Sequence, residues 1–123
     1  MGYHVVDPDD IAPESNRPSE TRYISDAIGM ANLGLRMYRV APGEEIPLSG
    51  LHYHDEQEEV FYVADGTLSV ETPDRDYRVD RGQFFVAEPG SPHRAYTDSD
   101  ADGEATVIGM GAPPVSDAHA YED

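Results

Sequence analysis

The sequence predicts an all-β fold, a barrel or double-sheet roll built as a single domain, from a chain of 123 residues. Two observations carry this prediction. Apolar and polar residues alternate in short runs between positions 33 and 112, which is the period of half-buried strands. Gly, Pro and Asp separate most of these runs, and no convincing helical pattern lies between them. A closed barrel or roll is favoured because it leaves few long strand edges exposed.

The residues before the first alternating run, 1–32, are expected to form an N-terminal arm that packs partly on the barrel. Residues 7–22 contain three prolines and offer little to bury, so an extended conformation is expected there. Residues 20–31 have room for a single helical turn. The barrel is expected over residues 33–112, and the acidic residues 113–123 are expected to form a short C-terminal tail.

The first strand of the barrel is predicted over residues 33–40, where Leu33, Leu35 and Met37 alternate with Gly, Arg and Tyr. The pair Asp65-Gly66 lies between two apolar runs and predicts a tight hairpin, because Gly accepts the positive φ that such turns need. Similar turn chemistry marks later junctions. The remaining strands are expected at residues 51–54, 59–64, 67–71, 76–80, 83–87, 93–97 and 106–110.

The chain carries a formal net charge of −17, and all eight of its cations are arginine. A nucleic-acid partner is not expected, because the phosphate backbone would be repelled. A surface rich in carboxylates and free of the strongly hydrated Lys ammonium resembles the composition of haloarchaeal proteins. This composition predicts a halophilic protein that loses stability in dilute buffer, where its self-repulsion is poorly screened.

Other features of the composition exclude further classes of protein. The absence of Cys excludes disulfides, thiolate metal sites and a Cys nucleophile. No apolar run approaches the ~20 residues of a transmembrane helix. The N-terminus lacks the basic and apolar regions of a secretory signal. We therefore expect a cytoplasmic location and no membrane partner.

The side chains that carry chemistry concentrate in residues 51–59. Residues two apart in a strand lie on one face about 6.6 Å from each other, so His52 and His54 can direct both imidazoles at one point. Such a pair suits a metal ion, although exposed His pairs without one are common. His93 follows a rigid Pro-Gly-Ser-Pro turn and can add a third imidazole from a distant strand. The spacing alone leaves four candidates for a carboxylate ligand: Asp55, Glu56, Glu58 and Glu59.

These residues stand at the spacings of two motifs, G-x5-H-x-H-x3,4-E-x6-G and G-x5-P-x-G-x2-H-x3-N, so the sequence resembles the cupin superfamily over roughly residues 43–97. The first motif is matched by His52, His54, Glu59 and Gly66. The second motif is matched by Gly82, Gly90 and His93. Both motifs occur together and in the expected order, which makes the resemblance specific.

The sequence departs from the two motifs at Ile46, which replaces the first Gly, and at Glu88 and Thr97, which replace the Pro and the Asn. The resemblance implies a cupin-type double-stranded β-helix, also called a jelly-roll barrel. It also implies a mononuclear metal site and favours Glu59 over Glu58 as its carboxylate. The metal ligands that it implies are His52, His54, Glu59 and His93.

Three neutral imidazoles and one carboxylate suit a divalent Mn, Fe, Ni, Cu or Zn ion. Resemblance to small cupins implies a metal-dependent enzyme of the dioxygenase, isomerase or decarboxylase type that acts on a small oxygenated molecule. No separate catalytic acid or base is identified. The alternative is a non-catalytic module that binds a sugar-like or acidic metabolite on the same barrel, since the fold does not decide function. The resemblance also suggests a homodimer, to which residues 33–40 can contribute.

Residues that share strand parity with the implied ligands are expected to face the interior of the barrel. Phe61 and Val63 share the parity of Glu59, and Ala95 shares that of His93, so the walls around a substrate are expected to be mainly apolar. Polar contacts with a substrate are conceivable from four further side chains, although a structural or exposed position is favoured for each: Arg36, Tyr53, Tyr62 and Tyr96.

Overall fold

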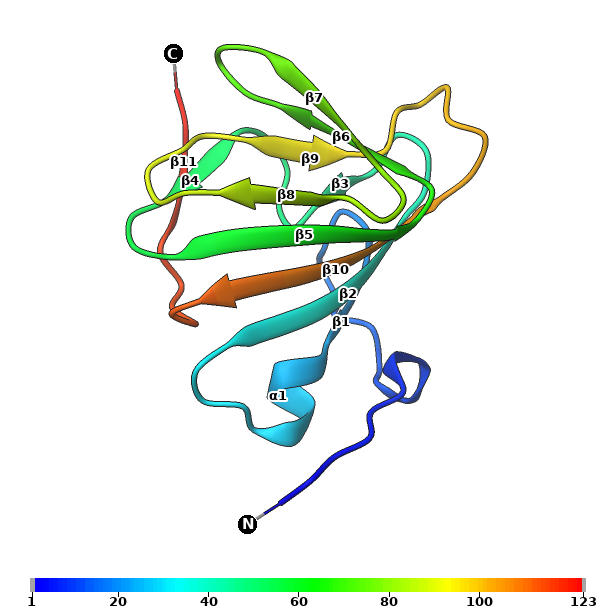
Figure 1. Cartoon of the computed structure of the whole chain (residues 1–123), viewed down its shortest axis with the longest axis vertical. Helices are drawn as coiled ribbons and strands as arrows, with labels where there is room; N and C mark the ends of the chain where they lie inside the picture. Colours follow the sequence, from blue (N-terminus) through cyan, green and yellow to red (C-terminus); the bar gives the residue numbers. More distant parts are fainter. Residues whose placement is uncertain (1, 123) are drawn as a thin grey trace.

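Eleven strands and one short α-helix make up the regular structure of residues 2–122, which the computed structural model describes (Figure 1). The strands are β1 (Glu20–Tyr23), β2 (Gly34–Val40), β3 (Glu45–Ile46), β4 (His52–His54), β5 (Glu58–Asp65), β6 (Thr67–Glu71), β7 (Asp76–Asp80), β8 (Phe84–Ala87), β9 (Arg94–Tyr96), β10 (Ala105–Ala112) and β11 (Ala118–Ala120). The helix is α1 (Ile24–Ile28), and a 3-10 turn, η1, covers Pro8–Asp10. The all-β prediction is therefore confirmed.

The strands form three antiparallel sheets. The largest has the order β1-β2-β10-β5-β8, the second has the order β3-β9-β6-β7, and the third pairs β11 with β4. Strands that are neighbours in a sheet are often distant in sequence, as with β2 and β10, which is the pattern of a rolled-up barrel. Figure 1 shows α1 on the β2 side of the barrel and the C-terminal strand beside β4.

Each strand expected from alternation is present, with ends that differ by one or two residues. The structure adds three strands: β1 inside the expected arm, the two-residue β3 inside the expected barrel, and β11 inside the expected tail. Neither β1 nor β11 has an alternating apolar face: β1 contains an ion pair between Arg22 and Glu20, and all three residues of β11 are exposed. The expected helical turn is α1, which ends at Gly29 with a φ of 70°.

The turn at Asp65-Gly66 differs from the predicted hairpin, because β5 pairs with β10 and β8, whereas β6 pairs with β7 and β9. The turn instead carries the chain from one sheet to another. Gly66 is needed there for two reasons: its φ is 76°, and a Cβ would lie 2.7 Å from the carbonyl oxygen of Glu104.

The core lies between the inner faces of the two larger sheets. Tyr38, Val107 and Val63 stand opposite one another on β2, β10 and β5 and are fully buried. The edge of the Tyr38 ring meets Phe61, with 6.4 Å between ring centroids. Full burial of a large apolar side chain contributes about 1.5–3 kcal/mol to the free energy of unfolding, so this packing stabilises the barrel that carries the site.

Within residues 2–122, no helix is long and apolar enough to cross a membrane.

Candidate metal centre

Strand β4 directs two imidazoles into the barrel, as its alternation predicts. His52 and His54 are buried, with 3% and 8% of their surface exposed, whereas the ring of Tyr53 turns away and packs against His119 at 5.3 Å. A reciprocal pair of backbone hydrogen bonds, of 3.0 and 2.9 Å, joins His52 to His93. This bridge brings the third imidazole beside the first two, although 40 residues of sequence lie between the bridged pair.

The three imidazoles all face one carboxylate oxygen, Oε1 of Glu59. Glu59 is fully buried, and its Oε1 lies 2.7 Å from Nε2 of His93. The same oxygen lies 3.5 Å from Nε2 of His54 and 3.8 Å from Nε2 of His52. Glu58 and the other two candidate carboxylates, Asp55 and Glu56, are exposed.

Three of the four expected ligands form a mutually close set. One ligand atom each from His52, Glu59 and His93 lies within 4.8 Å of the other two, and all three residues are buried. His54 is near Glu59 but farther from the other imidazoles: its ring centroid is 5.4 Å from that of His52 and 6.3 Å from that of His93. The buried set of three residues could therefore hold a metal ion, with His54 at its side.

Unpartnered atoms support this interpretation. Among the described residues, Nε2 of His52, Nε2 of His54 and Oε2 of Glu59 are buried without a hydrogen-bond partner. Buried polar atoms nearly always have a partner, and each unpaired atom costs about 1–3 kcal/mol. A divalent cation would satisfy neutral imidazole nitrogens and a carboxylate together. The residues present thus suit a bound metal ion.

The Nδ1 atom of each imidazole, which points away from Glu59, faces an oxygen that can accept a hydrogen bond from it. Nδ1 of His93 donates to the carbonyl of Ser91 at 2.8 Å, and Nδ1 of His52 lies 3.4 Å from the carbonyl of Gly50. Nδ1 of His54 donates to Oδ1 of Asp117 at 2.9 Å. A proton on Nδ1 leaves the lone pair on Nε2, which is the nitrogen that faces Glu59.

Charge around Glu59 keeps its carboxylate ionised. Burial alone raises the pKa of Glu59, but the neighbouring imidazoles of His52, His54 and His93 together outweigh burial and hold the pKa well below its ordinary value. The nearby carboxylate of Glu59 is also the main reason why the pKa of His54 is raised, against the opposing effect of burial. The site therefore presents an anion to a cation that enters it.

Arg36 contributes a buried positive charge that the strand pattern did not predict. Its Nη2 lies 3.9 Å from Oε2 of Glu59, and its Nε and Nη2 are buried without hydrogen-bond partners among residues 2–122. The guanidinium also lies 5.9 Å from the ring centroid of Tyr38. The alternation put Leu35 and Met37 on the apolar face and favoured a structural or exposed position for Arg36, but the structure brings Arg36 to the carboxylate.

Asp117 is the other residue that sequence analysis missed. Its Oδ2 accepts hydrogen bonds from the backbone N–H groups of Glu56 and Gln57 at 2.7 and 3.1 Å, while Oδ1 accepts from His54. Burial raises the pKa of Asp117, but these three donors outweigh burial and lower it. The residue is 63 positions from His54 in a segment expected to be a tail, so no local signal pointed to it.

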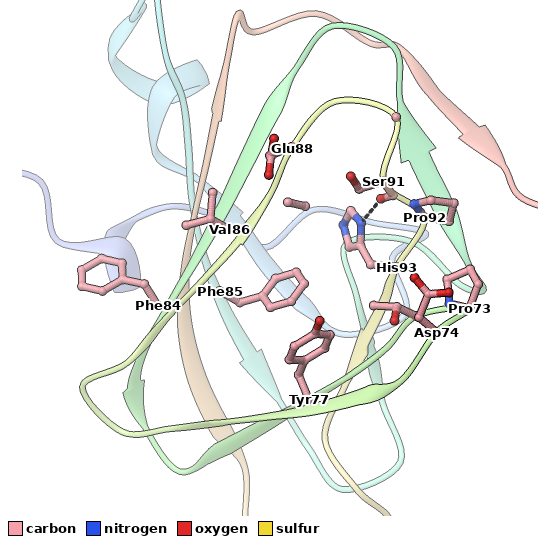
Figure 2. Close-up of a pocket in the computed structure, with 13 residues that line it drawn as sticks. Pro73, Asp74, Tyr77, Phe84, Phe85, Val86, Glu88, Ser91, Pro92 and His93 are labelled. Carbon is pink, nitrogen blue, oxygen red and sulfur yellow. Dashed lines mark hydrogen bonds between the residues drawn. The ribbon is translucent and has the colours of Figure 1, made fainter.

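A pocket of about 550 Å³ lies against His93 (Figure 2). Figure 2 shows the ring of Phe85 between His93 and Tyr77, and the ring centroids of these neighbours lie 5.9 and 5.8 Å from that of Phe85. Two carboxylates, Asp74 and Glu88, also line the pocket, and its described lining contains no Lys or Arg. The walls thus come from β8, from β7 and the turn before it, and from the turn before β9.

The apolar walls expected from parity are placed differently. Phe61, Val63 and Ala95 are fully buried in the core and do not line this pocket. Parity identified the correct face of the strands, but these three side chains pack in the hydrophobic core and do not reach the pocket. Tyr62 and Tyr96 pack at the surface against Phe84 and Arg94, which agrees with the structural positions favoured for them.

Residues 36–109 match the family described as the cupin domain. No curated protein matches the chain. Among solved structures, the chain is similar to a sugar phosphate isomerase of the cupin superfamily from Silicibacter pomeroyi, at 20% identity, over 98% of this chain and 83% of that one, with a TM-score of 0.80. It is also similar to a polyketide cyclase from Streptomyces resistomycificus, at 24% identity, over 99% and 89% of the two chains, with a TM-score of 0.74.

A third similar structure is a candidate sugar phosphate isomerase from Acidithiobacillus ferrooxidans, at 19% identity and with a TM-score of 0.70. The match covers 82% of this chain but only 64% of that one, so the present chain spans less than two thirds of its length. At these identities, the structural likeness shows the fold alone. The family match, however, covers more than half of the sequence, and the protein therefore belongs to the cupin family.

Proposed function

We propose that this cupin is a mononuclear metal-dependent enzyme that acts on a small oxygenated molecule. The observation that carries the proposal is the convergence of three buried imidazole nitrogens on one oxygen of Glu59, two of them without any hydrogen-bond partner among the described residues. His52, Glu59 and His93 would hold the ion, and His54 would be the fourth ligand. The buried triad and the known cupin enzymes of similar fold support the proposal.

His54 is proposed as a ligand for two reasons. Its Nε2 faces the same carboxylate oxygen as the other imidazoles, at 3.5 Å. Its Nδ1 donates to Asp117, so its Nε2 lone pair is free to bind a cation. A small shift of the ring toward Glu59 on metal binding would complete a site of three imidazoles and one carboxylate.

A divalent ion bound here would supply Lewis-acid stabilisation of an oxygen that becomes negatively charged. The chain's own residues would support that chemistry by charge and position. Arg36 would add a second positive charge on the far side of Glu59, where its two unpartnered N–H groups lie. Phe85 and Tyr77 would orient a planar molecule against His93 and exclude water from one face.

The composition of the pocket favours an uncharged aromatic or enol substrate over a phosphorylated sugar. Its lining offers the rings of Tyr77, Phe84 and Phe85 for stacking. Asp74 and Glu88 would repel a phosphate group, and the described lining offers no Lys or Arg to bind one. Dioxygenase, isomerase and decarboxylase reactions all remain within this proposal, because each proceeds through an oxygen that carries negative charge.

The test is to measure the metal content of the purified protein and then to assay the Fe(II) and Mn(II) forms. The panel contains a flavonol, an enediol and a sugar phosphate, and the readouts are oxygen uptake and product formation. We expect bound metal at one ion per chain and turnover of an aromatic or enol compound. Binding of a ligand without turnover would favour the alternative, a non-catalytic binding module, and failure to bind any divalent ion would refute the metal-dependent enzyme.

The expected homodimer, cytoplasmic location and adaptation to salt stay predictions. Light scattering would test the first, and thermal unfolding at several salt concentrations would test the last. The function proposed above depends on none of these three predictions.

A further inference from the structure

The C-terminal segment lies along the strand that carries two of the proposed ligands. Strand β11 pairs with β4 in antiparallel register, with Ala118 opposite His54 and Ala120 opposite His52. The backbone N–H of Tyr121 then donates to the carbonyl of Leu51 at 3.0 Å. Figure 1 shows this red segment at the edge of the barrel beside β4. On its other side, β4 is joined by the bridge between His52 and His93 and by a hydrogen bond of 2.7 Å from the backbone N–H of Gly90 to the carbonyl of His54.

Asp117 directly precedes β11, and its side chain contacts His54, one of the proposed metal ligands. Its carboxylate accepts one hydrogen bond from Nδ1 of His54 and two from the backbone of the loop after β4. Only 14% of its side chain is exposed, so water competes weakly for these bonds. Gln57 makes a second contact with the C-terminal segment: its Nε2 donates a hydrogen bond to the carbonyl of Pro113 at 3.0 Å.

A carboxylate at this position decides which nitrogen of His54 carries the proton. An ionised carboxylate can only accept, so the imidazole must place its proton on Nδ1. The lone pair then lies on Nε2, which points at Glu59. Carboxylates that bind the outer nitrogen of a metal-ligating His fix its tautomer and its orientation, and their loss typically weakens metal affinity about 10–100-fold.

We infer that Asp117 is the positioning residue for His54 and that the C-terminal segment is a functional part of the metal centre. This inference rests on the proposed function, because it assumes that His54 binds the ion. It differs from a purely structural role of Asp117, in which the two backbone hydrogen bonds would hold the loop and the contact with His54 would be incidental.

The substitution Asp117→Asn separates these two roles. The Asn side chain keeps its size, and its carbonyl oxygen can still accept from the backbone N–H groups of Glu56 and Gln57. Its NH₂ group would then face Nδ1 of His54 and select the tautomer with the proton on Nε2. That tautomer has no lone pair to offer at the metal position.

Asp55→Asn is the matched control. Asp55 belongs to the same loop and contacts the C-terminal segment through Nε2 of His119 at 2.6 Å, but the structure gives it no contact with His54. Both substitutions remove one negative charge from the same region, so a general electrostatic effect would appear equally in the two variants.

The measurement is Zn²⁺ affinity of the full chain by competition with a chromophoric chelator. We expect Asp117→Asn to weaken binding about 10–100-fold and Asp55→Asn to leave it within a factor of about two of wild type. Nitrogen NMR of ¹⁵N-histidine in the metal-free proteins at about pH 9, well above the ordinary pKa of an imidazole, should show neutral His54 with its proton on Nδ1 in wild type and on Nε2 in Asp117→Asn.

Two further variants keep the test decisive. In a His54→Gln background, Asp117→Asn should cause no further loss of Zn²⁺ affinity, whereas a structural role would still lower it. Asp117→Glu retains a carboxylate, so it should keep the wild-type tautomer and bind more tightly than Asp117→Asn even if the latter folds poorly.

The outcomes distinguish the inference from the function on which it rests. If wild type and Asp55→Asn both fail to bind Zn²⁺, the metal centre itself is wrong. If wild type binds Zn²⁺ and Asp117→Asn binds it equally well with an unchanged tautomer, the metal centre stands and the role of Asp117 is overturned.

Discussion

Glu59→Gln is the most direct perturbation of the candidate metal centre, because it removes one charge and keeps the size of the side chain. Oε2 of this fully buried residue lies 3.9 Å from Nη2 of Arg36. At an effective dielectric constant of about 20, two unit charges at that distance attract each other by about 4 kcal/mol. Removing one partner of a buried pair costs about 3–5 kcal/mol, because the other charge stays buried. We expect the metal-free variant to lose roughly 3 kcal/mol of the free energy of unfolding.

The assay is thermal unfolding by circular dichroism with a chelator present and the salt concentration fixed. For a domain of this size, 1 kcal/mol shifts Tm by about 4 °C, so the expected decrease is roughly 12 °C. Glu58→Gln is the control, because Glu58 is the exposed neighbour on the same strand and surface substitutions usually change stability by less than about 0.5 kcal/mol. Equal Tm values for the two variants would refute the assignment of Glu59 as the charged centre of the site.

Three further predictions concern the surface charge, the core and the pocket. Tm should rise between dilute buffer and molar salt, since the net charge of −17 is then screened, and an unchanged Tm would contradict salt adaptation. Gly109→Ala should lower the free energy of unfolding by about 1–3 kcal/mol, because its Cβ would lie 2.6 Å from Cε2 of Tyr38, whereas Gly103→Ala meets nothing within 4 Å and should be neutral. Phe85→Leu should weaken binding of a flavonol about 2–10-fold in a calorimetric titration, while Tyr53→Phe, outside the pocket, should not.

The sequence revealed the strands that bury one face, because alternation records burial directly. His52, Tyr53 and His54 show this: the two imidazoles are buried and the Tyr ring between them is not. The choice of Glu59 over Glu58 came from the motif spacing instead, since either carboxylate was compatible with strand parity. The structure places Glu59 inside and Glu58 outside.

Other features of the site depend on contacts that alternation does not encode. Alternation put Leu35 and Met37 on the apolar face of β2, so it gave no sign that Nη2 of Arg36 would lie 3.9 Å from the carboxylate of Glu59. Strand β11 is exposed at every position, so its pairing leaves no apolar pattern in the sequence. Asp117 acts through hydrogen bonds to residues about 60 positions away, and such long-range polar contacts have no local signature.

The pairing of β11 with β4 also sets an order of events during protein synthesis. Strand β11 is synthesised after the other strands described here, so β4 is first held only from its other side, by the bridge to His93 and the hydrogen bond from Gly90 to His54. Affinity for the proposed metal ion is therefore expected to reach its final value only after β11 has paired with β4.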